Sequence, residues 1–240
     1  MREQGLEAAK RFVHDTFPNC SFAILAGSAS RGEETPTSDL DIVIFQETPG
    51  SYRESFYFYN WRIEVFVHDF ESYLEEFENE KRKGRPVLGS MIVEGKVIKS
   101  SNQYKLVKEH ALLHVTNGPV PLTAEFITSS RYYIYDLLDD FTDSTNYEEA
   151  LITLNTLSLQ VADFILRYNQ RWSGRGKNLT KALRSFDHQV YEDFFSSMNS
   201  FYWNNDKLPF IQFANQVYEP VGGLLFEGFL QKGKGSGRVL

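Results

Sequence analysis

The stretch that decides the fold reads GSASRG at residues 27–32 and, five residues later, SDLDIVIF at residues 38–45. An apolar run at residues 21–26 comes directly before the first glycine, which is the pattern of a buried strand closed by a turn. The second apolar run carries two carboxylates at its start, Asp39 and Asp41. This order predicts a strand, a glycine turn, a short helix and a strand that opens with paired carboxylates.

The two aspartates and the glycine turn point to a ligand that carries phosphate. Residues i and i+2 of a strand face the same side, so Asp39 and Asp41 are expected about 6–7 Å apart between Cα atoms. Two like charges this close favour a bound cation, and hard oxygen ligands suit Mg²⁺, which takes one or two carboxylates and leaves other positions to water and phosphate. Gly27 permits a tight turn, while Ser28 and the N–H groups that follow can donate to phosphate oxygens.

Glu64 is the candidate third carboxylate. It lies within the run at residues 62–67, which is predicted as a strand that follows another at residues 56–59. If this strand pairs beside Asp39 and Asp41, the three carboxylates can clamp two metal ions about 3.5–4 Å apart for in-line displacement at phosphorus. On this interpretation all three are catalytic metal ligands. The alternative is that Glu64 faces solvent from an alternating strand.

Through these residues the sequence resembles the DNA polymerase β-like nucleotidyltransferase superfamily, whose signature is a GS turn, a D-x-D strand and a third carboxylate on a later strand. The resemblance covers residues 20–67. It implies a mixed sheet flanked by helices, a nucleoside triphosphate with Mg²⁺ as donor, and transfer of a nucleoside monophosphate to a hydroxyl with release of pyrophosphate, as in EC 2.7.7 enzymes. The turn then binds triphosphate, and Asp39 and Asp41 bind the metal. Glu64 stands where many members have Asp.

Further candidate nucleotide ligands lie near this signature and in the second half of the chain. The predicted nucleotide-binding residues are Gly27, Ser28, Arg31, Ser38 and Lys177. Arg31 either reaches the β- or γ-phosphate or is a solvated helix residue. Lys177 ends a basic, glycine-rich segment at residues 171–177, whose cations either reach a triphosphate or interact with the C-terminal dipole of the preceding helix.

Composition limits the class of protein. The 25 Lys and Arg residues against 32 Asp and Glu give a net charge of −7, which argues against an extended nucleic-acid partner. The single cysteine, Cys20, argues against an internal disulfide and a thiolate metal cluster. The charged N-terminus lacks the apolar stretch of a secretory signal, and no apolar run is expected to approach the roughly 18 residues of a membrane span. We therefore expect a cytoplasmic protein without a membrane partner.

After residue 100 the sequence changes from β-branched runs to long amphipathic segments. Helices are expected at residues 5–16 and 69–83 and then at about 103–115, 123–141, 146–170, 178–200 with a break near Asp187, and 207–218. With the resemblance, the predicted fold class is α+β: a nucleotidyltransferase-fold mixed β-sheet domain at residues 1–100, then an α-helical bundle domain at residues 101–240. The basic end at residues 232–238 is predicted to be a frayed terminus.

The helical half resembles that of the bacterial antibiotic nucleotidyltransferases, such as the kanamycin enzyme. This resemblance implies that the bundle helps to hold the acceptor, with the active site in a cleft between the domains. Within the bundle, Asp136, Asp139 and Asp140 are candidates for the general base on the acceptor hydroxyl or for binding a cationic acceptor. The alternative is that they solvate the polar face of a helix.

The expected reaction is Mg²⁺-dependent transfer of AMP from ATP to a hydroxyl of a small-molecule acceptor, with an aminoglycoside-like antibiotic as the leading acceptor. Two alternatives stay open. One is a protein adenylyltransferase of the antitoxin type, and the other is a non-catalytic nucleotide-binding regulatory module. A homodimer is one option for the assembly.

Overall fold

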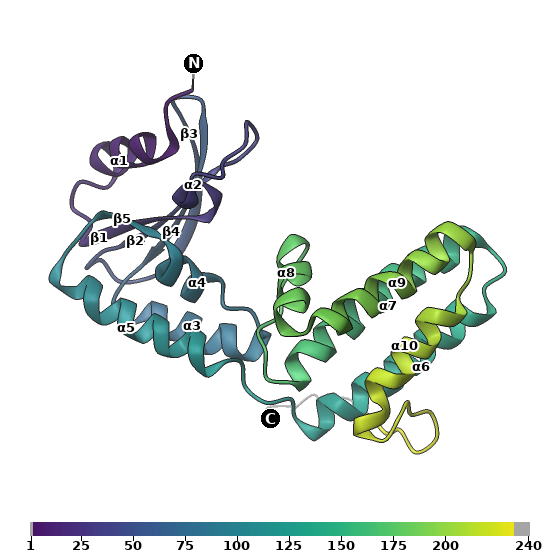
Figure 1. The fold of residues 1–240 in the computed structure, drawn as a ribbon. Coiled ribbons are helices and arrows are strands. Elements are labelled where there is room, and N and C mark those ends of the chain that lie inside the picture. The colour runs from purple at the N-terminus through teal and green to yellow at the C-terminus, as the bar shows by residue number, and fades with distance from the viewer. Residues whose placement is uncertain (1, 233–240) are drawn as a thin grey trace, which may run out of the picture. The chain divides into compact units, whose positions relative to one another are not determined.

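The computed structural model of the protein describes residues 2–232 (Figure 1). The chain divides into two compact units, Met1–Pro119 and Val120–Leu240. The prediction of a frayed basic end concerns residues 232–238, which apart from Lys232 lie outside the described residues.

The first unit is built on a five-stranded sheet with the order β3-β4-β2-β1-β5. The strands are β1 Phe22–Ala26, β2 Leu40–Phe45, β3 Tyr52–Phe58, β4 Trp61–His68 and β5 Lys96–Lys99. Strands β2 and β4 pair in parallel, and the other pairs of described strands are antiparallel, so the predicted mixed sheet is confirmed. Sequence patterns missed β5 and the first half of β3 because both are edge strands, whose exposed side chains need no regular apolar alternation.

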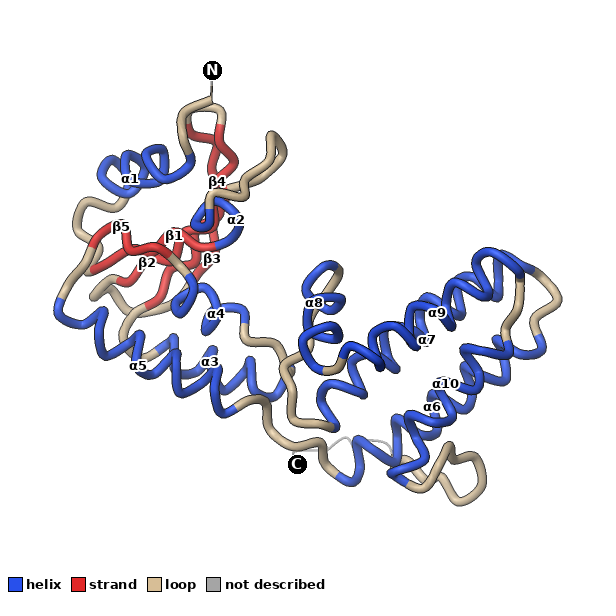
Figure 2. Tube along the Cα trace, in the orientation of Figure 1, coloured by secondary structure: helices blue, strands red, loops and turns tan. Residues whose placement is uncertain are grey.

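Helices cover both faces of this sheet (Figure 2). They are α1 Gly5–Thr16, α2 Gly27–Arg31, α3 Ser72–Lys83, α4 Val87–Glu94 and α5 Asn102–Asn117. On one face, Phe12 of α1 packs in a core with Ile42 and Val65, whereas on the other face α3, α4 and α5 pack over Val43 and Phe45. Each of the two cores therefore lies between one face of the sheet and its own set of helices. In β2 the odd-numbered residues face α3, α4 and α5.

The boundary between the units lies after helix α5, later in the chain than predicted. The change in sequence character near residue 100 predicted that the helical domain begins at residue 101, but the first unit continues to Pro119. The physical reason is that Val107 and Ala111 of α5 are buried in the core formed with Phe45 and the helices α3 and α4. A helix following the last strand therefore completes the first unit.

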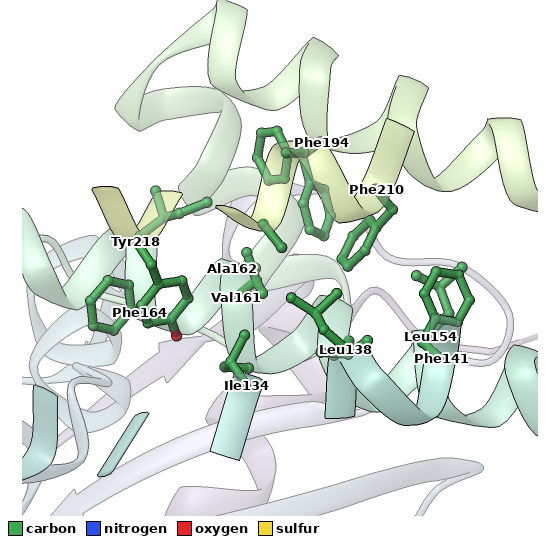
Figure 3. Close-up of a cluster of buried hydrophobic side chains, with 14 of the residues drawn as sticks. Ile134, Leu138, Phe141, Leu154, Val161, Ala162, Phe164, Phe194, Phe210 and Tyr218 are labelled. Carbon is green, nitrogen blue, oxygen red and sulfur yellow. The ribbon is translucent and has the colours of Figure 1, made fainter. Parts of the chain in front are cut away.

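Helices are the only regular secondary structure among the described residues of the second unit, as predicted. It contains α6 Ala124–Asp143, α7 Tyr147–Tyr168, α8 Lys177–Phe186, α9 His188–Asn204, α10 Leu208–Tyr218 and the 3₁₀ turn Glu219–Val221. Figure 3 shows its core, where Leu154 and Val161 of α7 lie among apolar side chains from α6, α9 and α10. The predicted break near Asp187 is confirmed: its carboxylate accepts the Val190 N–H at 2.9 Å and caps α9.

Helix α7 is long and apolar enough to cross a membrane by length and composition alone, with a mean hydropathy of 1.2 over its best 18-residue window. The prediction that no apolar run approaches this length was therefore wrong. Half of that window is buried inside the protein, among the core side chains around Leu154 and Val161. A buried core helix accounts for this composition, so α7 is weak support for a membrane span.

Candidate functional site

The turn that follows β1 lies directly against one of the predicted carboxylates. Gly27 adopts a φ of +69°, a left-handed conformation that side chains disfavour. Its neighbour Ala26 is paired with Asp41 in the sheet, and a Cβ atom at Gly27 would lie 2.4 Å from Asp41 Oδ2. The predicted phosphate turn and the predicted metal carboxylate are thus in contact, and this contact requires glycine.

The strand register brings Asp41 beside Glu64. In the parallel pair β2–β4 these two residues are direct partners, so their side chains leave the same face of the sheet on neighbouring strands. Asp39 stands immediately before β2, two residues from Asp41. The three predicted metal ligands therefore lie at one end of the two central parallel strands.

Glu64, however, forms an ion pair with a positively charged side chain of the protein itself. Arg53, on the edge strand β3, forms an ion pair with Glu64, and its guanidinium carbon lies 4.8 Å from the centroid of the Phe66 ring. Arg53 reaches Glu64 because residues diagonal across an antiparallel pair are within reach of a long side chain.

Among residues 2–232 no three His, Cys, Asp or Glu side chains are grouped so that they could hold a metal ion. In this structure Glu64 bonds Arg53, and a clamp of Glu64 with Asp39 and Asp41 stays a prediction. Asp39 and Asp41 stay the predicted metal ligands, and Mg²⁺ takes one or two protein carboxylates together with phosphates and water.

Two predicted nucleotide-binding serines meet beside the turn. Ser28 Oγ donates to Ser38 Oγ at 3.3 Å, and Ser38 Oγ also accepts the Thr35 N–H at 2.9 Å. Arg31 instead forms an ion pair with Glu33 at 2.8 Å and lies 3.9 Å from Glu94. The loop before β2 thus brings hydroxyl groups next to Gly27, while the arginine is directed toward acidic side chains at the surface.

Arg2 supports this loop and was missed by sequence reasoning. It donates to the carbonyl oxygens of Ser38 at 2.5 Å and Pro36 at 2.8 Å, and its guanidinium carbon lies 3.1 Å from the centroid of the Trp61 ring. Burial and the nearby Arg62 lower the pKa of Arg2, and the negative charge of Asp39 opposes this effect. No local pattern marks such a residue, because its partners lie more than thirty positions away.

A buried acid and a buried histidine join the three helices behind the sheet. Glu80 of α3 accepts the backbone N–H groups of Leu88 and Gly89, and it bonds His114 Nε2 at 2.7 Å. A Cβ atom at Gly89 would lie 2.6 Å from the His114 ring, so glycine makes room for the pair. In the sequence Glu80 stands at the start of a charged cluster. Its structural role here is to connect α3, α4 and α5.

The remaining predicted residues belong to the second unit. Asp136, Asp139 and Asp140 are all exposed on α6, and a hydrogen bond to Asp139 raises the pKa of Tyr135. Lys177 is exposed as the first residue of α8. Within the first unit, by contrast, Gly27, Ser28, Ser38, Asp41 and Glu64 lie around one end of strands β1, β2 and β4. A cleft between the units stays a prediction.

Comparison with known proteins gives a family match for part of the first unit. Residues 6–110 match the sequence model of the nucleotidyltransferase domain family. A solved structure of a nucleotidyltransferase-like protein from Exiguobacterium sibiricum 255-15 is similar at 12% identity with a TM-score of 0.47, covering 90% of this chain and 73% of that one. No curated protein matches the chain. The first unit thus carries a match to the nucleotidyltransferase domain, a domain that supports nucleotidyl transfer in general.

Proposed function

We propose that the protein is a Mg²⁺-dependent nucleotidyltransferase that moves a nucleoside monophosphate, AMP from ATP in the simplest case, onto a hydroxyl of a small-molecule acceptor and releases pyrophosphate. The observation that carries the proposal is the contact between Gly27 and Asp41, where a turn suited to phosphate lies against a carboxylate suited to a metal. The domain match over residues 6–110 supports the same class of reaction.

The residues present fit a Mg²⁺ ion bound together with a triphosphate. Asp39 and Asp41 would hold the ion, and the absence of a side chain at Gly27 lets the backbone approach the Asp41 carboxylate closely. When bound, Mg²⁺ neutralises charge on the phosphates that develops during transfer. The protein would supply the Asp39 and Asp41 carboxylates, and the close approach of Gly27 to Asp41 supports this proposal.

The other side chains of the first unit have roles on the donor. The hydroxyl groups of Ser28 and Ser38 would donate to phosphate oxygens, and Arg31 would add positive charge at the end of α2. During transfer the acceptor oxygen forms a bond to the α-phosphorus, and the bond from that phosphorus to the oxygen bridging the α- and β-phosphates breaks. The electron pair leaves with pyrophosphate, and the hydroxyl proton passes to a base, for which Asp136, Asp139 and Asp140 are our candidates.

The proposal also includes the setting of the reaction. We place it in the cytoplasm, with an aminoglycoside-like antibiotic as the first acceptor to test and without a nucleic-acid or membrane partner. Lys177 is the candidate triphosphate ligand from the second unit, and its replacement by Met should raise the KM for the triphosphate if it fills that role. A homodimer is the assembly to test by light scattering.

The test is a mass-spectrometric transfer assay with Mg²⁺, mixed nucleoside triphosphates, a panel of hydroxylated compounds and proteins of a lysate as acceptors. We expect a nucleotidyl mass gain on a small molecule. Asp39→Asn and Asp41→Asn should abolish the gain while the protein stays folded, and Asp193→Asn, at an exposed position of α9, should retain it.

Each other outcome has a defined meaning. A mass gain on protein would support an adenylyltransferase of the antitoxin type. Triphosphate binding without pyrophosphate release would support a non-catalytic regulatory module. Full activity in either aspartate variant would refute the metal assignment. Glu64→Gln distinguishes the two roles of Glu64. If Glu64 binds the metal, the variant should lose as much transfer activity as Asp41→Asn does. If Glu64 only pairs with Arg53, the variant should lose less.

A further inference from the structure

The order of the strands indicates on which side of the proposed reaction centre the triphosphate binds and from which side the acceptor approaches. This inference rests on the proposed function. Across the sheet the glycine turn follows β1, the aspartate pair opens β2, and Glu64 and Arg53 lie on β4 and β3. In phosphoryl transfer the attacking and leaving oxygens stand roughly in line on opposite sides of phosphorus. If the triphosphate binds at the turn on the β1 side, the acceptor approaches from the side of β4 and β3.

A groove lies on that side. It has a volume of about 370 Å³ and is lined by Arg53 and Phe66 of the sheet, Glu76 of α3, and Val87 and Met91 of α4, among other residues. Its size falls in the range of small-molecule sites, about 300–1,000 Å³. Phe66 is two residues beyond Glu64 on the same strand face, about 6–7 Å along the strand. The groove therefore begins two residues from Glu64 along β4, and its lining belongs entirely to the first unit.

The apolar part of the lining is open to solvent. Val87 is 56% exposed, although its side chain is apolar. Phe66 also lines the groove, with the Arg53 guanidinium over its ring. Covering such a concave apolar surface with a ring or an aliphatic segment of a ligand removes it from water, which is favourable.

The charged groups of the groove differ in how they are neutralised. Arg53 is paired with Glu64, and Glu80 accepts two backbone N–H groups and bonds His114. Glu76 accepts a hydrogen bond from the neutral Asn79 amide at 3.3 Å and lies near His68, whose pKa is lowered by burial and raised by the negative charge of Glu76. A ligand that carries a cationic amine next to its apolar part would place that amine near the Glu76 carboxylate.

We propose that this groove is the acceptor site and that its acceptor is a small hydroxyl-bearing amine with an aromatic or aliphatic body. This assigns acceptor binding to the first unit, between the sheet and the helices α3 and α4. It also favours an amphiphilic amine over a fully polar polycation, because most of the lining that a ligand would cover is apolar.

The test compares two probes of the same shape on the full-length protein by saturation-transfer NMR and titration calorimetry. Tyramine carries a phenol ring and an amine, and tyrosol replaces the amine by a neutral hydroxyl. We expect tyramine to bind more tightly than tyrosol. Glu76→Gln should weaken tyramine by about fivefold and leave tyrosol unchanged, which is the loss expected for one partly exposed charge pair.

Matched variants separate the groove from general effects. Val87→Lys places a cation at the groove and should weaken tyramine at least as much as Glu76→Gln does. Glu75→Gln removes a carboxylate from an exposed position of the same helix and should change neither probe. Binding of Mg²⁺ and ATP, measured in parallel, should be the same in all three variants.

The proposal is overturned if neither probe binds the wild-type protein, if tyramine and tyrosol respond equally to Glu76→Gln, or if binding survives both groove variants. These results differ from failure of the proposed function. That failure would appear as an absence of Mg²⁺-dependent ATP binding and of pyrophosphate release in wild-type protein, whatever the probes do in the groove.

Discussion

Replacing Gly27 by alanine tests whether the turn and the Asp41 carboxylate act as one unit. The substitution has two effects that can be separated. It places a side chain on a left-handed backbone, and it puts a Cβ atom 2.4 Å from Asp41 Oδ2. Gly32 provides the matched control, since its φ of +71° is nearly the same and a Cβ atom there meets nothing within 4 Å.

The magnitudes follow from this comparison. A left-handed conformation costs a residue with a Cβ atom about 1–2 kcal/mol, so both variants should lose that much unfolding free energy. At Gly27 the Asp41 carboxylate must also move by about 1 Å to reach ordinary contact, and an off-rotamer side chain adds about 1 kcal/mol. Because a displacement of this size can lower a rate about 100-fold, Gly27→Ala should lose transfer activity to that extent.

The assay measures urea unfolding and the initial rate of pyrophosphate release on the same preparations. We expect Gly32→Ala to be less stable than wild type but within a few-fold of its rate, and Gly27→Ala to be less stable and about 100-fold slower. If the two variants lose activity equally, the strain of the turn alone is responsible. If Gly27→Ala retains the full rate, its contact with Asp41 has no part in the reaction.

Three further predictions concern the surroundings of the site. The N–H groups of Ser72, Gly50 and Glu71 lower the pKa of Asp69. The ionised carboxylate therefore stabilises the folded state above about pH 4, and this stabilisation is lost as the pH falls. Asp69→Asn should flatten the dependence of the urea midpoint on pH between about 5 and 3. Glu80→Ala leaves two buried N–H groups without their acceptor and should lower the unfolding free energy by about 3 kcal/mol in urea titration, whereas a loss under about 1 kcal/mol would contradict the role given to it. Arg2→Met should speed hydrogen exchange in residues 33–38 and raise the KM for ATP, and unchanged exchange would show that Arg2 does not hold this loop.

The central elements of the first unit could be predicted from local sequence. The run at residues 21–26, the glycine that ends it and the run at residues 40–45 correspond to β1, the turn and β2 almost residue for residue. Each is specified by neighbours in the chain, because continuous apolar runs favour buried strands and glycine accepts the left-handed turn. The long amphipathic period of residues 146–170 specified α7 in the same way.

The electrostatic partners of the site could not be predicted, because they come from distant parts of the chain. Glu64 lies on an apolar strand, which agrees equally with a metal ligand and a solvent-facing residue. Its partner Arg53 becomes its neighbour only when β3 folds back along β4. The pairs Arg2 with Ser38 and Glu80 with His114 likewise span more than thirty residues.

The sequence by itself determined the order of a strand, a glycine turn and a strand that opens with carboxylates, since these depend on residue type at short spacing, and the resemblance carried by these residues implied the α+β class. Only the tertiary structure decided that α5 completes the first unit, that Arg53 neutralises Glu64, and that a groove opens between the sheet and α4. The physical reason is that burial and charge pairing depend on which distant surfaces come together, and strand pairing and helix packing create those neighbours.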